Sequence, residues 1–208
     1  MSHILDIKYG GVSVNEADKA IIMLHGRGGK AEDILSISQY LELPGFALVA
    51  PQATNSTWYP YSFLAPIEEN EPWLSSAIDI VGKTFEELLN HGFTAENIYF
   101  LGFSQGACLT LEYTARNAQR YGGIVAFTGG LIGDEIDPAK YKGDFEQTPV
   151  MLSTGDPDAH VPVDRVLSTS GFFKEMNASV TEKVFPGKVH SVSMKEIEIA
   201  NNLIFGQK

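Results

Sequence analysis

The residues with the clearest chemical potential lie at positions 102–106, where the sequence reads Gly-Phe-Ser-Gln-Gly. An apolar run at residues 98–101 precedes them and predicts a buried strand, whereas residues 107–113 predict a helix. A serine on the sharp turn between a strand and a helix projects its hydroxyl from the strand end, in the arrangement called a nucleophile elbow. The same five letters alone would fit an ordinary turn with a capping serine. The flanking patterns favour Ser104 as a nucleophile.

A serine hydroxyl needs a base to remove its proton, and the base needs an acidic side chain to orient it. After such an elbow the expected chain order is Asp or Glu and then His, each in a loop that follows a strand. His190 fits the base because it lies between the last predicted strand and the last predicted helix. For the acid, the loop at residues 155–162 offers Asp156 and Asp158, and spacing alone does not choose between them.

The remaining histidines and the single cysteine have less specific interpretations. His160 lies in the loop expected to supply the acid, and His25 is expected to shape a glycine-rich loop by hydrogen bonding. His3 and His91 are expected at the surface. Cys108 is the single cysteine, so an intrachain disulfide is excluded. Its position predicts a small buried helix residue rather than a second nucleophile.

Negative charge that develops on an attacked carbonyl oxygen needs hydrogen-bond donors fixed in advance. One predicted donor is the backbone N–H of Gln105, directly after the serine. The other is the backbone N–H of Arg27, in the glycine-rich loop at residues 25–29, which lacks the Gly-Lys-Ser/Thr of a phosphate-binding loop. Two hypotheses exist for the Arg27 side chain: it points to solvent, or it lies at the mouth of the site and favours acidic substrates.

Residues 56–73 are rich in aromatic side chains with prolines between them. These aromatics could line a pocket for an acyl or aryl group, or they could pack over the edge of the sheet as part of the core. Both interpretations are open. For the pocket, Trp58 and Phe63 are the residues that we expect to bind substrate.

The elements that must position these residues alternate between strands and helices. Continuous apolar runs predict buried strands at residues 20–24, 46–50, 98–101, 123–127 and 149–153. A short first strand is expected at 4–9, turned by two glycines into 12–14, and a half-buried edge strand at 180–184. Helical patterns cover 31–41, 72–91, 163–176 and the region from 197 to 204, and residues 128–148 are expected to be a long polar connection. The order predicts one α/β domain, residues 1–208, with a mostly parallel sheet and helices on both faces.

Composition limits the partners of the chain. A formal net charge of −11 argues against nucleic-acid binding and disfavours docking on anionic lipid. The amino-terminal residues do not resemble a signal peptide, and no apolar run is long enough for a membrane span, so a cytoplasmic location without stable membrane insertion is expected. The five histidines are scattered without metal-ligand spacing. A homodimer is an open alternative, although no exposed apolar helix demands one.

Four segments, in order along almost the whole chain, resemble the phospholipase/carboxylesterase family of α/β-hydrolases. This family includes acyl-protein thioesterases and small bacterial carboxylesterases. The segments are residues 24–28, 102–106, 155–162 and 187–191. The resemblance implies the α/β-hydrolase fold without a large cap domain, and no metal or organic cofactor.

The resemblance also implies the roles of the site residues. Ser104 is the nucleophile, His190 the base and Asp158, in the pattern Asp-x-x-Val-Pro, the acid. The amides of Arg27 and Gln105 form the oxyanion hole. Together they imply a serine hydrolase that cleaves a small-molecule ester.

Within that family the expected activity is hydrolysis of short-chain carboxylic esters through an acyl-enzyme. The eukaryotic thioesterases usually have Leu-Gly-Asp after His-Gly, whereas this chain has Arg-Gly-Gly at residues 27–29, which favours a bacterial-type esterase. The alternative is a lysophospholipase or acyl-protein thioesterase that acts on long acyl chains. A non-catalytic binding protein on the same scaffold is a third hypothesis, which an intact triad disfavours.

Overall fold

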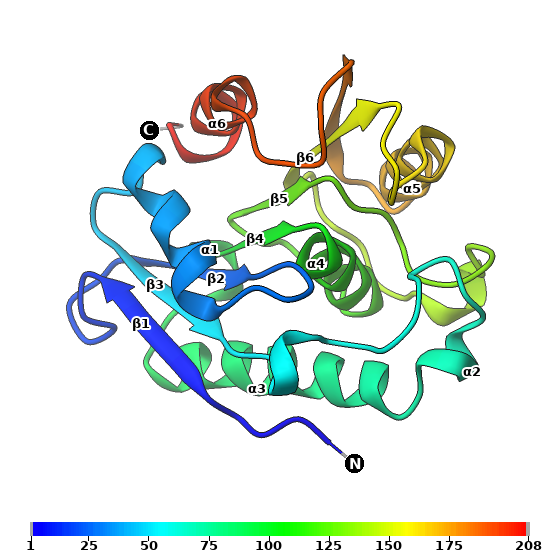
Figure 1. The fold of residues 1–208 in the computed structure, drawn as a ribbon. Helices are drawn as coiled ribbons and strands as arrows, with labels where there is room; N and C mark the ends of the chain where they lie inside the picture. Colours follow the sequence, from blue (N-terminus) through cyan, green and yellow to red (C-terminus); the bar gives the residue numbers. More distant parts are fainter. Residues whose placement is uncertain (1, 207–208) are drawn as a thin grey trace.

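A seven-stranded sheet lies between two layers of helices in the computed structural model, which describes residues 2–206 (Figure 1). The strand order is β1-β3-β2-β4-β5-β6-β7, with β1 antiparallel to β3 and every other neighbouring pair parallel. The strands are β1 (Ile7–Gly11), β2 (Lys19–Leu24), β3 (Phe46–Pro51), β4 (Ile98–Phe103), β5 (Gly123–Phe127), β6 (Pro149–Asp156) and β7 (Ser179–Pro186). The mostly parallel sheet of the α/β-hydrolase fold is confirmed, and residues 2–206 contain no large cap domain.

Helices cover both faces of the sheet, as predicted. One face packs against α3 (Trp73–Asn90), α4 (Gln105–Arg116) and α5 (Val163–Glu175). The other face packs against α1 (Ala31–Ser36) and α6 (Met194–Ala200). The short α2 (Ile67–Asn70) precedes α3. Both layers exclude water from the central strands, so almost every residue of β2 to β6 is buried.

The burial of β7 differs from that of the central strands because β7 has a neighbouring strand on one side only. It forms one edge of the sheet and is half-buried, as the sequence predicts for residues 180–184, but its burial does not alternate, because Val180, Thr181 and Glu182 are all half-buried. Val180 packs partly against the core, whereas Lys183 is exposed.

The amino-terminal prediction is wrong in its bounds and in its pairing. Strand β1 begins at Ile7 rather than residue 4, and it pairs antiparallel with β3 instead of forming a hairpin with residues 12–14. The strand ends at Gly11, whose φ of +68° and whose approach to Phe46 favour glycine: a Cβ there would lie 2.4 Å from the Phe46 carbonyl oxygen. The Val12 amide then donates to that same oxygen.

Helix boundaries follow the predictions more closely. The pattern at 31–41 divides into α1 and a 3₁₀ turn at Ile37–Tyr40, and α6 continues as a π-helical turn at Asn201–Phe205. The connection at 128–148 is less polar than predicted, because Leu131, Ile132 and Phe145 are buried in it.

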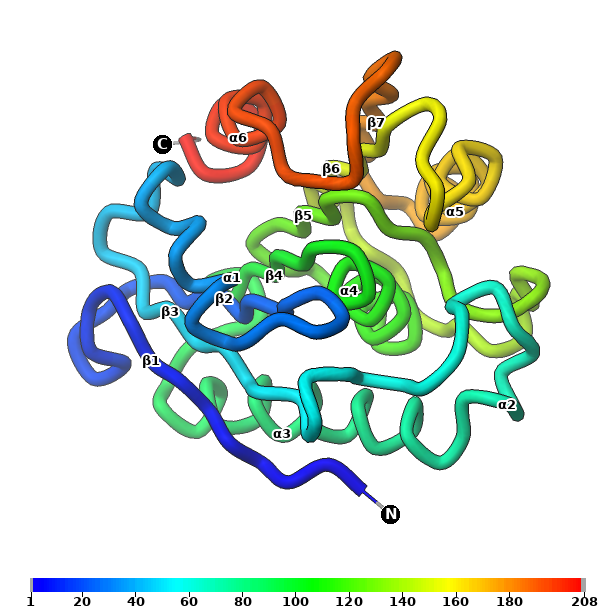
Figure 2. Tube along the Cα trace, viewed as in Figure 1, coloured from blue at the N-terminus to red at the C-terminus, as the bar shows by residue number. Residues whose placement is uncertain are grey.

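The loops that follow the carboxyl ends of the parallel strands meet at one edge of the sheet. The loop after β2 lies beside the start of α4 (Figure 2), so closely that a Cβ on Gly106 would lie 2.2 Å from the Leu24 carbonyl oxygen. Open parallel sheets bind their ligands at this edge.

Candidate active site

Ser104 occupies a strained turn between β4 and α4. Its backbone has φ 53° and ψ −118°, a conformation that costs free energy for a residue with a side chain. Glycines on both sides permit the turn: a Cβ on Gly102 would lie 2.4 Å from the Gly106 carbonyl oxygen. The turn therefore presents the Ser104 hydroxyl at the strand end, where the sequence predicts it.

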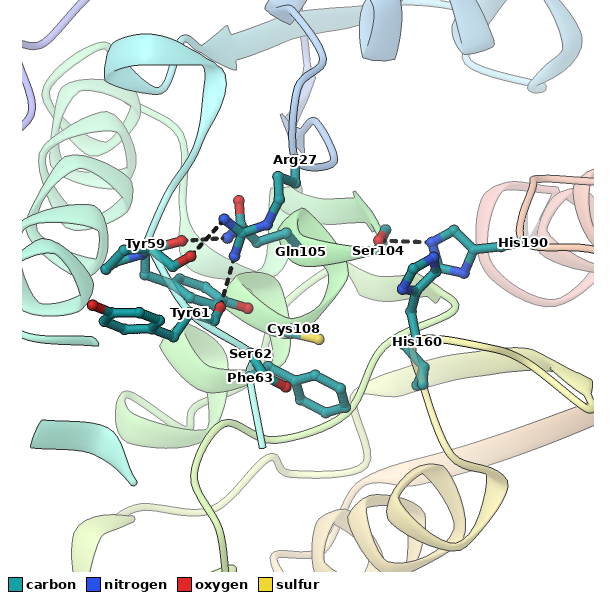
Figure 3. A pocket seen from close by; sticks show the side chains of 12 residues that line it. Arg27, Tyr59, Tyr61, Ser62, Phe63, Ser104, Gln105, Cys108, His160 and His190 are labelled. Carbon is teal, nitrogen blue, oxygen red and sulfur yellow. Dashed lines mark hydrogen bonds between the residues drawn. The ribbon is translucent and has the colours of Figure 1, made fainter. Parts of the chain in front are cut away.

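Three residues from three different loops form one hydrogen-bonded chain. His190 Nε2 lies 2.8 Å from Ser104 Oγ (Figure 3), and His190 Nδ1 lies 2.9 Å from Asp158 Oδ2. Because the carboxylate can only accept, the proton lies on Nδ1, and Nε2 is left to accept from the serine hydroxyl. The geometry is that of a nucleophile, a base and an orienting acid.

Asp158 and Asp156 have different surroundings. The Asp158 side chain is fully buried and accepts the backbone N–H groups of His160 and Val161 as well as the His190 ring. Burial raises the pKa of Asp158, but these hydrogen bonds outweigh it and hold the pKa below its usual range. Asp156 is exposed at the end of β6, and its carbonyl accepts from the amide of Gly187. The structure thus brings Asp158, and not Asp156, to His190.

The two backbone amides predicted to form the oxyanion hole belong to Gln105, which directly follows Ser104, and to Arg27, whose neighbour Gly26 lies beside Ser104. Gln105 is the first residue of α4. Its N–H therefore belongs to the first turn of the helix, where N–H groups have no acceptor within the helix. Between residues 2 and 206 we find no acceptor for the N–H of Arg27. The helix N-terminus adds a partial positive charge beside Ser104.

The side chains of the same two residues hold the aromatic loop after β3, a function that the sequence analysis missed. Gln105 Oε1 accepts the Trp58 amide at 2.9 Å, and its Nε2 donates to the Tyr59 carbonyl at 2.8 Å. Arg27 donates from its two terminal nitrogens to the carbonyls of Pro60, at 2.8 Å, and Tyr61, at 2.7 Å (Figure 3). Sequence reasoning had no signal for these contacts, since their partners are backbone atoms that any residue provides.

A cavity of about 470 Å³ opens beside Ser104. Phe63, one of the two residues expected to bind substrate, lines it together with Tyr59, Cys108 and Val161. Burial raises the pKa of Cys108 to about 12, so the thiol stays protonated and is a poor nucleophile. This agrees with the predicted small buried residue.

Trp58, the other residue expected at the pocket, does not line the cavity. Its side chain is completely buried, its Nε1 donates to the His25 carbonyl at 2.9 Å, and its ring centroid lies 5.0 Å from that of His25. Trp58 therefore belongs to the core that supports the loop of residues 25–29, which corrects the prediction.

Two other histidines also lie in this core. His25 shapes its loop as predicted, because Nδ1 donates to the Gly26 carbonyl and Nε2 accepts the Ala53 amide. His3, expected at the surface, is buried: Nε2 donates to the Trp58 carbonyl and Nδ1 accepts the amide of Thr54. The sequence around His3 does not predict this burial, because the residues that His3 contacts lie more than fifty positions away.

A buried ion pair lies behind the loop that carries His190. Lys188 Nζ is 3.3 Å from Glu196 Oε1 and donates to the Ser191 carbonyl at 2.6 Å. Glu196 is fully buried and also accepts from the hydroxyls of Ser153 and Ser193. The pair ties the His190 loop to α6, and sequence analysis had no indication of it.

The fold and this arrangement of serine, histidine and aspartate define an α/β-hydrolase. Residues 12–205 match the model of the family described as Phospholipase/Carboxylesterase. The chain belongs to the phospholipase/carboxylesterase family, as the sequence resemblance indicates, and it is a carboxylic ester hydrolase.

Individual proteins of known structure or name support this assignment. A crystal structure of a phospholipase/carboxylesterase from Dyadobacter fermentans shares 55% identity, covers 99% of this chain and 98% of its own, and superposes with a TM-score of 0.97. Acyl-protein thioesterase 1 from Kluyveromyces lactis is 28% identical over 204 residues, which is 88% of this chain and 89% of that protein. Carboxylesterase SOBER1 from Arabidopsis thaliana is 26% identical over 145 residues, which is 70% of this chain and 63% of that protein.

Among residues 2–206, no helix combines the length and the apolar character that crossing a bilayer requires.

Proposed function

We propose that this hydrolase cleaves short-chain carboxylic esters with Ser104 as its nucleophile. The observation that carries the proposal is the hydrogen-bonded chain in which His190 Nε2 lies 2.8 Å from Ser104 Oγ and Nδ1 lies 2.9 Å from Asp158 Oδ2. The distances allow proton transfer between the hydroxyl and the ring without rearrangement.

In the first half of the proposed reaction, Ser104 Oγ attacks the carbonyl carbon while its proton moves to His190 Nε2. The buried carboxylate of Asp158 stabilises the imidazolium that forms. The amides of Arg27 and Gln105 donate to the oxyanion. When the tetrahedral intermediate collapses, the carbon–oxygen bond to the alcohol breaks, and Nε2 returns the proton to the leaving oxygen.

In the second half, His190 removes a proton from water, and the hydroxide oxygen attacks the acyl carbon. Collapse then breaks the bond to Ser104 Oγ, which regains the proton from His190. The product is a free carboxylic acid, and no cofactor takes part.

The preference for short acyl groups is supported by the lining of the cavity. Polar side chains, among them Arg27, Ser62 and His160, interrupt the apolar surface that a long acyl chain would need. The alternative, a lysophospholipase or an acyl-protein thioesterase that acts on long chains, takes its support from the names of relatives such as the Kluyveromyces lactis protein.

The test uses a fluorophosphonate probe, which reacts with activated serines, on the wild type and on Ser104→Ala. Ser62→Ala is the matched control, because Ser62 lines the same cavity without contacting His190. We expect labelling of the wild type and of Ser62→Ala, and none of Ser104→Ala. Folded wild-type protein that resists labelling would instead support the binding-protein hypothesis.

A panel of esters with one alcohol and acyl groups of increasing length then separates the two activities. We expect kcat/KM to be highest for acyl groups of a few carbons. A kcat/KM that keeps rising through long acyl chains would favour the lysophospholipase or thioesterase activity.

A further inference from the structure

A second cavity, of about 420 Å³, lies beside His190, which also lines the first. It is formed by the glycine-rich loop after β2, by α1 and the turn that follows it, and by residues 190–192. His190 and Arg27 line both cavities, so the two spaces meet at the reacting groups. We propose that this second cavity binds the alcohol half of the substrate, and that the substrates are esters of apolar alcohols. The inference rests on the proposed function.

The lining of each cavity suits one half of the ester. The acyl carbon becomes bonded to Ser104 Oγ, and because Ser104 and Gln105 line the first cavity, we assign the acyl group to that cavity. The alcohol never bonds to Ser104 and must receive its proton from His190 Nε2. The second cavity is lined by His190, Ser191 and Val192 and not by Ser104, which suits a group that leaves past the histidine.

Gly26 lines the second cavity and packs closely against the turn that carries the nucleophile. A Cβ on Gly26 would lie 3.4 Å from Ser104 Cβ and 3.2 Å from Phe103 Cδ1, so a larger residue would press on that turn. The second cavity therefore lies next to Ser104, and an ester can reach both spaces along Arg27 and His190, which line both.

The walls of the second cavity select an apolar group. Its apolar lining consists of Ile34, Ile37, Phe103 and Val192. Of the polar lining residues, His25 uses both ring nitrogens in backbone hydrogen bonds, and exposed Asp33 accepts the Lys30 amide. Arg27 donates to two backbone carbonyls, while His190 and Ser191 lie on the side of the reacting groups. We therefore assign the alcohol to the four apolar side chains, against which an alkyl or aryl group gains free energy by leaving water.

Acetate esters of primary alkanols from methanol to hexanol test the proposal with the complete protein. All of them form the same acetyl-enzyme, so differences in kcat/KM between them belong to the alcohol half. For the wild type we expect kcat/KM to rise by about two- to fourfold for each methylene that becomes buried. A kcat/KM that does not depend on alkanol length would overturn the proposal.

Two substitutions at Ile37 change the volume of the second cavity in opposite directions. Ile37→Trp fills it, so the dependence of kcat/KM on alkanol length should disappear. Ile37→Ala enlarges it and should shift the optimum to bulkier alcohols. Leu167→Trp, at an exposed position on α5, is the control for a new tryptophan and should leave the profile unchanged.

Labelling of Ser104 by the fluorophosphonate probe distinguishes failure of the proposed function from failure of the proposed alcohol site. If the wild type is not labelled, the proposed function fails. If Ile37→Trp is labelled and its profile equals that of the wild type, only the alcohol site fails. Should Ile37→Trp not fold, Val192→Phe narrows the same cavity from the loop that follows His190 and is judged by the same profile.

Discussion

At the scale of single residues, two side chains in this site have structural roles that their residue types do not predict. Gln105 and Arg27 are expected to contribute amides, yet their side chains bind the backbone of residues 58–61. The position of the Arg27 guanidinium combines parts of both earlier hypotheses. It lies at the mouth of the first cavity, but its donors are engaged by two carbonyls and its charge lies over the Tyr59 ring.

Substitution of Arg27 distinguishes loop support from substrate charge recognition. Arg27→Ala removes two hydrogen bonds from a charged donor at an exposed site, so we expect KM to rise about three- to tenfold for neutral and anionic esters alike. The amide of residue 27 remains, so kcat should change little. The measurement is kcat and KM for a neutral and an anionic ester of equal acyl length.

Arg27→Lys provides the matched control, because it keeps the charge but replaces the planar fork with a single ammonium group. If loop support dominates, lysine should not restore KM. If the anionic ester alone loses affinity in Arg27→Ala and regains it in Arg27→Lys, the preference for acidic substrates is the correct hypothesis.

At the scale of elements, the loop that carries His190 is held from behind. Lys188 and Glu196 form an ion pair with exposed side-chain fractions of 9% and 0%, and the same lysine donates to the Ser191 carbonyl, next to the histidine. The chain offers a second lysine–glutamate pair for comparison, between Lys174 on α5 and Glu182 on β7, but there the exposed fractions are 48% and 33%.

We predict that the two pairs differ strongly in their contribution to stability. Lys188→Met leaves the buried Glu196 carboxylate without its cation, so the free energy of unfolding should fall by about 3–5 kcal/mol. Lys174→Met breaks a solvated pair and should cost less than about 1 kcal/mol. Urea unfolding at neutral pH measures both values.

The double variant Lys188→Met with Glu196→Gln tests the cause. Without a buried charge it should recover part of the loss seen in Lys188→Met. If Lys188→Met and Lys174→Met lower the free energy of unfolding equally, burial of the ion pair does not determine its contribution to stability.

At the scale of the whole molecule, two histidines are folded into the interior in their neutral form. Burial lowers the pKa of His3 and of His25 from the ordinary 6.5, although hydrogen bonds from each ring to a backbone carbonyl oppose this. Each ring also accepts an amide on its other nitrogen, which a second proton would prevent. Below an ordinary histidine pKa of about 6.5, the unfolded chain therefore binds more protons at these residues than the folded protein.

The two neutral histidines make the stability of the protein depend on pH. The stability from these neutral histidines is complete above pH of about 6.5 and decreases as the pH falls toward their folded pKa values. His3→Gln retains one acceptor and one donor for Thr54 and Trp58 but cannot be protonated. We predict that the slope of the unfolding free energy between pH 6.5 and 5 decreases in His3→Gln by up to about 1.4 kcal/mol per pH unit.

Denaturant unfolding at several pH values checks this, with His91→Gln as the control for the same substitution at an exposed histidine. A slope in His3→Gln equal to that of the wild type would show that His3 does not take up a proton on unfolding. The cytoplasmic location, the lack of nucleic-acid partners and the open alternative of a homodimer stay predictions at this scale.

The sequence by itself determined the order of the elements and the residues of the hydrogen-bonded chain. Apolar runs predict the central strands because a strand covered on both faces needs apolar side chains throughout. Ser104 and His190 could be found because local signals surround them: glycines at a strained turn in one case, and a place between the last strand and last helix in the other. Asp158 needed the family resemblance, since Asp156 has an equivalent local context.

Only the tertiary structure decided what the other side chains contact. Trp58 and Phe63 lie five positions apart in one irregular loop, yet one belongs to the core and the other lines the cavity. His3 is buried by residues more than fifty positions away. The second cavity combines α1 with a loop more than 150 residues later in the sequence. Such contacts join distant segments, often through backbone atoms that every residue has, so the local pattern of residue types contains no record of them.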